Sequence, residues 1–182
     1  MRNPDQIKKY LLSNKHLNRL VEFVYFDDNH EYDKLKEVIF NIHNSNRNHN
    51  ILVLGRTNAI INRCFDTDCL NDELGTKISF VGYEDIELEG MTIHKSKGLT
   101  FDEVIVIGLN KSFPSSDKSN NWIISLFRYP SVIEKIPYAE ERRLFYVALT
   151  RTKNKVYLLV NKDETKQSVF INEIKEICYN KQ

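Results

Sequence analysis

Long apolar runs, paired cysteines and a secretion signal are all missing from this 182-residue sequence. Its longest apolar runs fall far short of the roughly 18 residues that a membrane-spanning helix needs. The N-terminus has no apolar core of the kind that a signal peptide carries. Three cysteines, an odd number, favour reduced thiols over a disulfide framework. These absences predict a cytoplasmic protein with no membrane partner.

Metal-binding spacings are missing as well. Cys64 and Cys69 stand five positions apart with no second pair of ligands nearby, so a tetrahedral zinc site would be incomplete. Four of the five histidines fall within the first fifty residues, and none has a metal-like spacing to another ligand. We therefore expect no metal site. We expect surface or capping roles for His16, His30, His43 and His49.

A third absence is the phosphate-binding P-loop. The nearest approach is Gly90 followed five positions later by Lys95 and Ser96. The loop needs a second glycine directly before the lysine, and His94 occupies that position. No other segment fits the pattern. If this protein handles a nucleotide, we expect another domain to hold the phosphates.

The alternation of apolar runs and amphipathic segments predicts one α/β domain. Hydrophobic residues make up 41% of the chain, enough to bury a core, and the 26 basic and 25 acidic residues nearly cancel. A nucleic-acid surface would therefore have to be a local patch. Alternating strands and helices favour a three-layer fold around a mainly parallel sheet. The predicted strands are Val21–Phe26, Ile51–Leu54, Ile78–Val81, Val104–Ile107 and Val156–Val160, and the predicted helices are Glu31–Asn44, Glu140–Arg151 and Gln167–Cys178, with a short one through Ile60 and Ile61.

The remaining segments are predicted to form short helical pieces or irregular structure. A helix start is expected at Asn3-Pro4-Asp5, and Trp122–Tyr129 is expected to form a helical turn. We expect residues 62–76 to form an irregular connection, and the acidic run Tyr83–Glu89 to be a solvated face.

The stretch from Met91 to Leu109 carries the strongest chemical signal. A turn rich in Lys, Ser and Gly leads into a fully apolar strand, and Gly98 gives the backbone freedom to approach a ligand closely. Cations, a hydroxyl and free N–H groups at a strand end suit a phosphate or a nucleic-acid backbone. A second polar cluster, Gly55–Asn58, follows the strand at Ile51, where ligands sit in parallel sheets. The alternative for Arg56 is a surface residue that caps the turn.

Three segments together resemble a known family. They are LGRTN (Leu54–Asn58), TIHKSKGLTFDEV (Thr92–Val104) and EERRLFYVALTRTKNKVYLL (Glu140–Leu159), and they resemble motifs IV, V and VI of the UvrD-like superfamily 1 helicases, in that order. GLNKSFP (Gly108–Pro114) resembles the loop after motif V, and NPDQIKK (Asn3–Lys9) resembles the lead-in of the helicase IV branch. The resemblance covers nearly all of residues 1–182 and implies the second RecA-like motor domain, a P-loop NTPase-like fold without Walker motifs.

The resemblance implies a division of labour between two motor domains. In the family, ATP with Mg²⁺ is bound mainly by the N-terminal RecA-like domain of the same polypeptide, which carries Walker A, Walker B and the catalytic glutamate. The second domain supplies arginine fingers that neutralise charge on the transferred phosphoryl group. By motif position, Arg56 and Arg151 would be these catalytic residues.

The resemblance also assigns the residues of motif V. Thr92 and His94 would contact single-stranded DNA, with Ser96 and Lys97 close by. The nucleotide side would comprise Gly98, Leu99, Thr100 and Glu141, in addition to the two arginines. Many relatives carry Glu at the position of Thr100, which puts the contact with the nucleotide ribose in question. Glu141 and Tyr146 would brace Arg151 or approach the nucleotide, with core packing as the alternative for Tyr146.

Two further alternatives remain open. The chain could be a stand-alone nucleic-acid-binding or scaffolding domain derived from a helicase half, without ATPase activity. A nuclease would need clustered carboxylates for metal ions, and the candidates are read as an ordinary polar loop (Asp66, Asp68, Asp72 and Glu73). Only about thirty residues separate Asn58 from Met91, so we expect no accessory-domain insertion between motifs IV and V.

Overall fold

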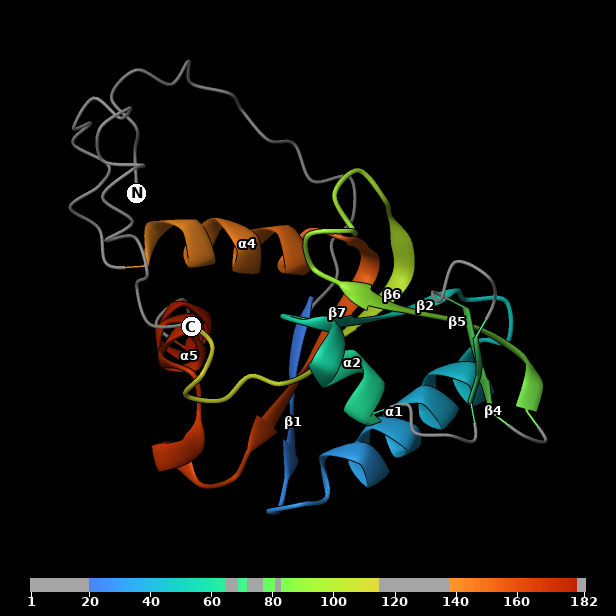
Figure 1. Ribbon diagram of the computed structural model, residues 1–182, viewed down its shortest axis with the longest axis horizontal. Helices are drawn as coiled ribbons and strands as arrows, with labels where there is room; N and C mark the ends of the chain where they lie inside the picture. The colour runs from blue at the N-terminus through green and yellow to red at the C-terminus, as the bar shows by residue number, and fades with distance from the viewer. Residues whose placement is uncertain (1–19, 65–68, 72–76, 81–82, 115–137, 180–182) are drawn as a thin grey trace.

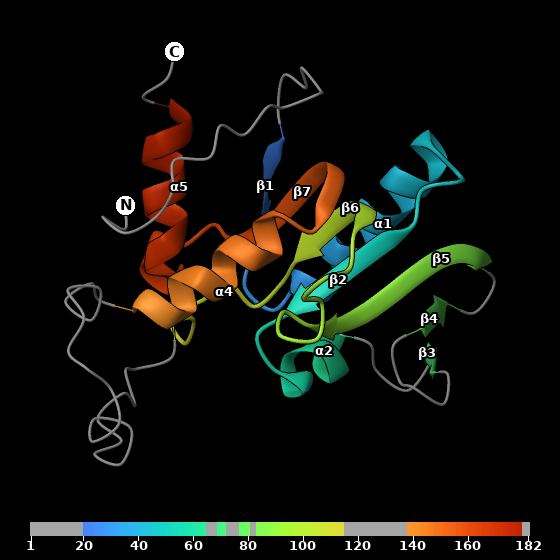
Figure 2. The same ribbon diagram turned by 90° about the horizontal axis from the view of Figure 1, so that it is seen from above.

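The computed structural model describes residues 20–64, 69–71, 77–80, 83–114 and 138–179, which form a seven-stranded sheet with helices on both faces (Figures 1 and 2). The strand order is β1-β7-β6-β2-β5-β4-β3. The strands are β1 (Val21–Phe26), β2 (Ile51–Gly55), β3 (Cys69–Asn71), β4 (Lys77–Phe80), β5 (Tyr83–Thr92), β6 (Phe101–Val106) and β7 (Thr152–Asn161). The helices are α1 (Glu31–Ser45), α2 (Asn58–Cys64), α4 (Ala139–Leu149), α5 (Val169–Tyr179) and the 3₁₀ turn η2 (Glu164–Lys166).

Five neighbouring strands run parallel, from β1 through β7, β6 and β2 to β5. This confirms the predicted three-layer α/β architecture around a mainly parallel sheet. The central strands read as unbroken apolar runs because both of their faces are covered, and every residue of β2 is buried. The predicted helices and strands of this part of the chain are confirmed within a few residues of their ends. Asn3–Asp5 and Trp122–Tyr129 lie outside the described residues.

The β3–β5 region differs from the sequence prediction in two places. The acidic run Tyr83–Glu89 lies in the ten-residue strand β5, which was not predicted, and the apolar residues Ile86 and Leu88 of this strand are buried. The solvated face expected for the acidic residues is compatible with such a strand. Acidic residues alternate with apolar ones there, which is the period of a strand with one buried face. Residues 62–76 contain the end of α2 and the strand β3. Strands β3 and β4 pair antiparallel, and β4 pairs antiparallel with β5, so this edge of the sheet is mixed.

The core lies in two layers, one on each face of the sheet. On one face, Leu35 and Ile39 of α1 pack in a layer with Val53 of β2, and Ile61 of α2 belongs to the same layer. On the other face, α4 and α5 cover a layer in which Phe113, Phe145 and Phe170 contact one another. Because α4 carries the first part of motif VI, this apolar layer sets the position of the motif over β6 and β7. Within the described residues, no helix is both long and apolar enough to cross a bilayer.

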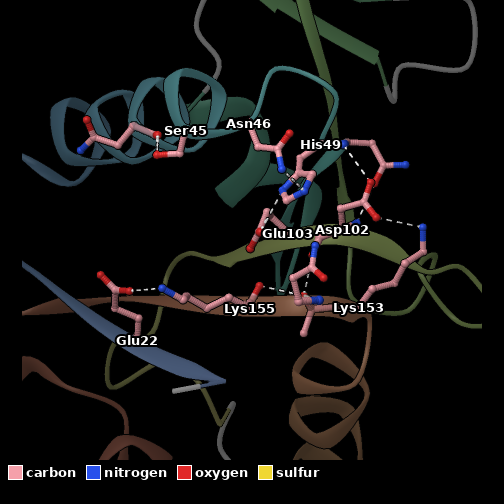
Figure 3. A network of polar contacts seen from close by, with 12 residues as sticks. Glu22, Ser45, Asn46, His49, Asp102, Glu103, Lys153 and Lys155 are labelled. Carbon is pink, nitrogen blue, oxygen red and sulfur yellow. Dashed lines mark hydrogen bonds and ion pairs between the residues drawn. The ribbon is translucent and has the colours of Figure 1, made fainter. Parts of the chain in front are cut away.

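A polar network joins the amino ends of the central strands (Figure 3). His49 lies 3.1 Å from the Glu103 carboxylate through its Nδ1 atom. The backbone N–H of Asn50 donates to Asp102, and the Asn50 side chain accepts from the Asp102 N–H. Lys155 pairs with Glu22 across a groove of about 610 Å³ beside α1. The network therefore anchors the start of β6 at the edge of the sheet away from Arg56.

Only some of the histidines have the surface or capping roles that the sequence predicts. His30 is exposed at the N-cap position of α1. His43, in contrast, is only 8% exposed, because it faces the core side of α1 together with Ile42. His49 is half-buried against Glu103. His16 lies outside the described residues.

Candidate functional site

Arg56 follows the carboxyl end of β2 and is held by a carboxylate from α4. Its Nη2 atom donates to Oε1 of Glu141 at 2.6 Å, and its Nε atom donates to Oε1 at 3.2 Å and Oε2 at 2.9 Å. These hydrogen bonds raise the pKa of Arg56 above its ordinary value, against the opposing effect of partial burial. The side chains of Arg56 and Glu141 are 25% and 12% exposed. Their guanidinium and carboxylate groups thus form a partly shielded ion pair.

The sheet places Arg56 next to the start of motif V. Gly55 pairs with Thr92 in the parallel ladder of β2 and β5, and the N–H of Ile93 donates to the Gly55 carbonyl at 3.0 Å. A side chain at Gly55 would lie 2.9 Å from Ile61, so this position has no room for a larger residue. Motif IV and motif V therefore leave the sheet side by side at the carboxyl ends of their strands.

A compact turn follows Thr92. The Thr92 carbonyl accepts from the N–H groups of Lys95 and Ser96 at 3.0 and 3.3 Å. The hydroxyl of Ser96 donates to the Ile93 carbonyl at 2.8 Å, and Ser96 is fully buried. The side chains of His94, Lys95 and Lys97 are exposed. The turn thus presents a histidine and two lysines to solvent, and Ser96 holds it closed from inside.

Gly98 reverses the chain at the end of this turn. Its φ of +87° lies in the left-handed region, and a Cβ built there would meet no atom within 4 Å. The expected need for backbone freedom at this position is therefore confirmed. Leu99, 42% exposed, and the exposed Thr100 follow and lead into β6.

Arg151 lies just beyond the last turn of α4 and reaches back to motif V. Its Nη1 atom donates to the Leu99 carbonyl at 3.0 Å, and its Nε atom donates to the Val147 carbonyl at 3.1 Å. Its own carbonyl accepts from the N–H of Phe101 at 2.9 Å. Arg151 therefore joins the end of α4, the turn after Gly98 and the start of β6.

The structure brings the predicted residues together in two separate groups. Arg56 meets Glu141 in the first turn of α4, and Arg151 meets Leu99 beyond its last turn. Glu141 and Arg151 are ten positions apart, and the helical part between them, from Glu141 to Leu149, spans about 12 Å. The two arginines thus share no contact partner in the described part of the chain.

The sequence analysis did not predict the contact between Arg56 and Glu141. The motif resemblance predicts that Glu141 braces Arg151 or approaches the nucleotide, but its carboxylate holds Arg56. No local signal could have identified a partner 85 positions away.

Core packing, the alternative for Tyr146, is wrong because Tyr146 is 61% exposed on α4. Among the described residues, no three His, Cys, Asp or Glu side chains are grouped as metal ligands.

Comparison with protein families matches residues 66–163, more than half of the chain, to the UvrD-like helicase C-terminal domain. The chain belongs to this family. The match includes motif V, motif VI and strand β7, and so covers the turn after Thr92 and the helix that carries Glu141. The resemblance read from the three sequence motifs is thereby confirmed.

Individual relatives agree with this assignment. The chain is 40% identical over 95 residues to DNA helicase IV of Escherichia coli (strain K12), covering 50% of this chain and 13% of that protein. It is 34% identical over 110 residues to an ATP-dependent helicase/nuclease subunit of Anoxybacillus flavithermus (strain DSM 21510 / WK1), covering 48% of this chain and 9% of that one. The chain therefore spans a small part of the curated relatives it matches.

A solved structure shows the same fold. The C-terminal domain of a possible DNA helicase from Lactobacillus plantarum WCFS1 superposes with a TM-score of 0.53 and 15% sequence identity. The superposition covers 84% of this chain and 78% of that one. This likeness agrees with the RecA-like arrangement of the UvrD-like C-terminal domain.

Proposed function

We propose that residues 1–182 are the second motor domain of an ATP-dependent DNA helicase or translocase. The observation that carries this proposal is one continuous turn, Thr92–Thr100. It exposes His94, Lys95 and Lys97 at one end, and at the other end its Leu99 carbonyl accepts from the Arg151 guanidinium. A strand of DNA bound to the cations would therefore act on the same segment that holds an arginine finger.

On the nucleotide side, Arg56 and Arg151 supply positive charge to the γ-phosphoryl group of ATP. Guanidinium groups suit this role because they stay charged and offer several donors to phosphate oxygens. ATP and Mg²⁺ are held by the N-terminal RecA-like domain of the same polypeptide, since this sequence contains no Walker A pattern. Gly98, Leu99 and Thr100 lie beside Arg151, where Thr100 offers a hydroxyl to the ribose. The isolated chain is expected to hydrolyse no ATP.

On the DNA side, the contacts are electrostatic and independent of sequence. His94 and Lys97 reach the phosphates of single-stranded DNA, and Thr92 contacts the strand at the start of the turn. Ser96 contributes through the shape of the turn, because its hydroxyl is bonded inside it. Contacts of this kind weaken as the salt concentration rises.

The test is hydrolysis of ATP stimulated by single-stranded DNA. It compares the chain alone with the chain joined to the first motor domain that we expect in its polypeptide. No turnover by the chain alone and stimulated turnover by the joined protein would support a motor whose second half is this chain. No turnover in either case, with DNA binding retained, would favour a stand-alone binding domain. Metal-dependent hydrolysis by the pure chain would contradict the proposal.

A further inference from the structure

We propose that Glu141 is a positioning residue for Arg56, holding one edge of its guanidinium so that the opposite edge faces the γ-phosphoryl group. This inference rests on the proposed function and adds a residue to its nucleotide site. The role is distinct from the direct nucleotide contact expected for Glu141, because here the carboxylate acts through Arg56.

The geometry of the pair assigns the two edges. Both carboxylate oxygens of Glu141 lie on the edge formed by Nε and Nη2 of Arg56, at 2.6 to 3.2 Å. The opposite edge, formed by Nη1 and the second N–H of Nη2, has no partner within the part of the chain that the structure describes. That edge offers two parallel N–H donors, the arrangement that binds a phosphate through two oxygens. Arg56 can thus keep Glu141 and bind phosphate at the same time.

The surroundings of Glu141 suit a rigid anchor. Glu141 lies in the first turn of α4, and its side chain is only 12% exposed. The next turn of α4 is fixed by Leu144 and Phe145, which are buried in the core. An arginine side chain loses conformational entropy when it is immobilised. Because Glu141 already orders Arg56, much of this cost does not have to be met when ATP binds.

The second arginine is held in a different way. Arg151 donates to the backbone carbonyls of Val147 and Leu99, which carry no net charge. Of the two arginines, it is therefore Arg56 whose charge is offset by a carboxylate. The Glu141 charge also lies near the expected phosphate position and repels it in the ground state. Orientation of Arg56 thus favours the transition state, while the net charge of the pair adds little to ATP affinity.

This balance predicts that a substitution at Glu141 lowers kcat without raising KM for ATP. Glu141→Gln keeps the size of the side chain, removes the repulsive charge and loses an acceptor on the Arg56 edge. We expect kcat to fall about 10- to 100-fold, since small misplacements of a catalytic group have effects of this size. We expect KM for ATP to stay the same or decrease. A residue that only stabilised the fold would lower the active fraction without this split.

The experiment measures kcat and KM for ATP at saturating single-stranded DNA in the two-domain protein. The variants are Glu141→Gln, Glu141→Asp and, as control, Glu176→Gln, which removes an exposed carboxylate from α5 that does not act on Arg56. The control should retain wild-type constants, and Glu141→Asp should recover part of kcat. Equal constants for Glu141→Gln and the control, in a protein that hydrolyses ATP, would overturn the positioning role and leave the proposed function intact.

A second comparison separates positioning from loss of stability. Glu141→Gln is combined with Arg56→Ala and compared with Arg56→Ala alone. If Glu141 acts through Arg56, the added substitution should change kcat by less than about twofold, because the two residues act as a unit. A further loss of about 10-fold in the Arg56→Ala background would overturn the proposal, because it would show an effect independent of the arginine. Absence of stimulated hydrolysis in the wild-type two-domain protein would overturn the proposed function and, with it, this role.

Discussion

The guanidinium Nη2 of Arg56 lies 2.6 Å from the carboxylate of Glu141, although 85 positions separate the two residues. The contact joins the turn after β2 to the first turn of α4, across the carboxyl edge of the sheet. It is also the point at which motif IV meets motif VI. We therefore expect the stability of the chain and the proposed chemistry to depend on the same pair.

The pair should contribute to the stability of the isolated chain. Removing one partner leaves a partly buried charge without its counter-ion, so we expect Arg56→Ala or Glu141→Ala to lower the free energy of unfolding by about 1–2 kcal/mol. The double variant Arg56→Ala with Glu141→Ala should cost less than the sum of the two single losses. Urea denaturation followed by circular dichroism measures both quantities. Strictly additive losses would contradict a coupled pair.

Arg151→Ala should separate ATP binding from turnover in the two-domain protein. An arginine finger acts chiefly in the transition state, so we expect ATP affinity to change little and kcat to fall about 10³-fold. Equilibrium binding of a fluorescent ATP analogue and steady-state hydrolysis provide the two measurements. Arg63→Ala is the control, since Arg63 is exposed on α2 and pairs with Glu31. Loss of affinity with unchanged kcat would remove Arg151 from the finger role.

His94 and Lys97 should affect the response to DNA more than basal hydrolysis. We expect Lys97→Ala to weaken binding of a single-stranded oligonucleotide and to reduce the slope of log K against log salt by about 0.7, the value for one phosphate contact. His94→Ala should raise the DNA concentration needed for half-maximal stimulation. Fluorescence anisotropy at several salt concentrations measures the slope.

The control for the DNA surface is Lys162→Ala. Lys162 is an exposed lysine that pairs with Asp27 beyond the end of β7, outside the turn after Thr92. Its substitution should leave both the slope and the stimulation unchanged. If His94→Ala lowers basal and stimulated hydrolysis equally, His94 belongs to the nucleotide side.

Glu103 should make stability depend on pH. Burial raises the pKa of Glu103, while His49 and Lys155 oppose this shift. Burial, followed by the charges of Glu103 and Glu22, raises the pKa of the neighbouring Tyr157 to about 12. Because the pKa of Glu103 is raised by burial, the folded state binds the Glu103 proton more tightly than the unfolded state does. The free energy of unfolding should therefore decrease as pH rises from the ordinary glutamate pKa of 4.5 to the raised value.

The corresponding variant is Glu103→Gln. It removes a buried charge whose Oε2 atom has no hydrogen-bond partner among the described residues, and a neutral amide is less costly to bury. We expect a higher unfolding midpoint at neutral pH, and we expect this gain to shrink as the pH falls through the same window. Glu37→Gln, which removes an exposed carboxylate from α1, should show no such trend. A gain that is independent of pH would contradict the assignment.

Local sequence determined most of the secondary structure and the family. The apolar run at Val104–Ile107 and the spacing of Leu35, Val38 and Ile42 depend only on near neighbours in the chain, because strand and helix periods place those residues on shared faces. The motif order also depends only on the linear sequence. Gly98 could be assigned to a sharp turn because glycine adopts a positive φ with little steric cost.

Tertiary structure decided what these elements contact. The β5 strand was missed because its many acidic residues suggested an exposed loop. In the folded chain, Ile86 and Leu88 of this strand are buried against the core. Ser96 became an internal brace because the turn folds its hydroxyl onto the Ile93 carbonyl. Glu141 pairs with Arg56 because the packing of α4 on the sheet brings the first turn of α4 close to the carboxyl end of β2. A linear sequence records the charges of such a pair, but only the folded chain sets the distance between them.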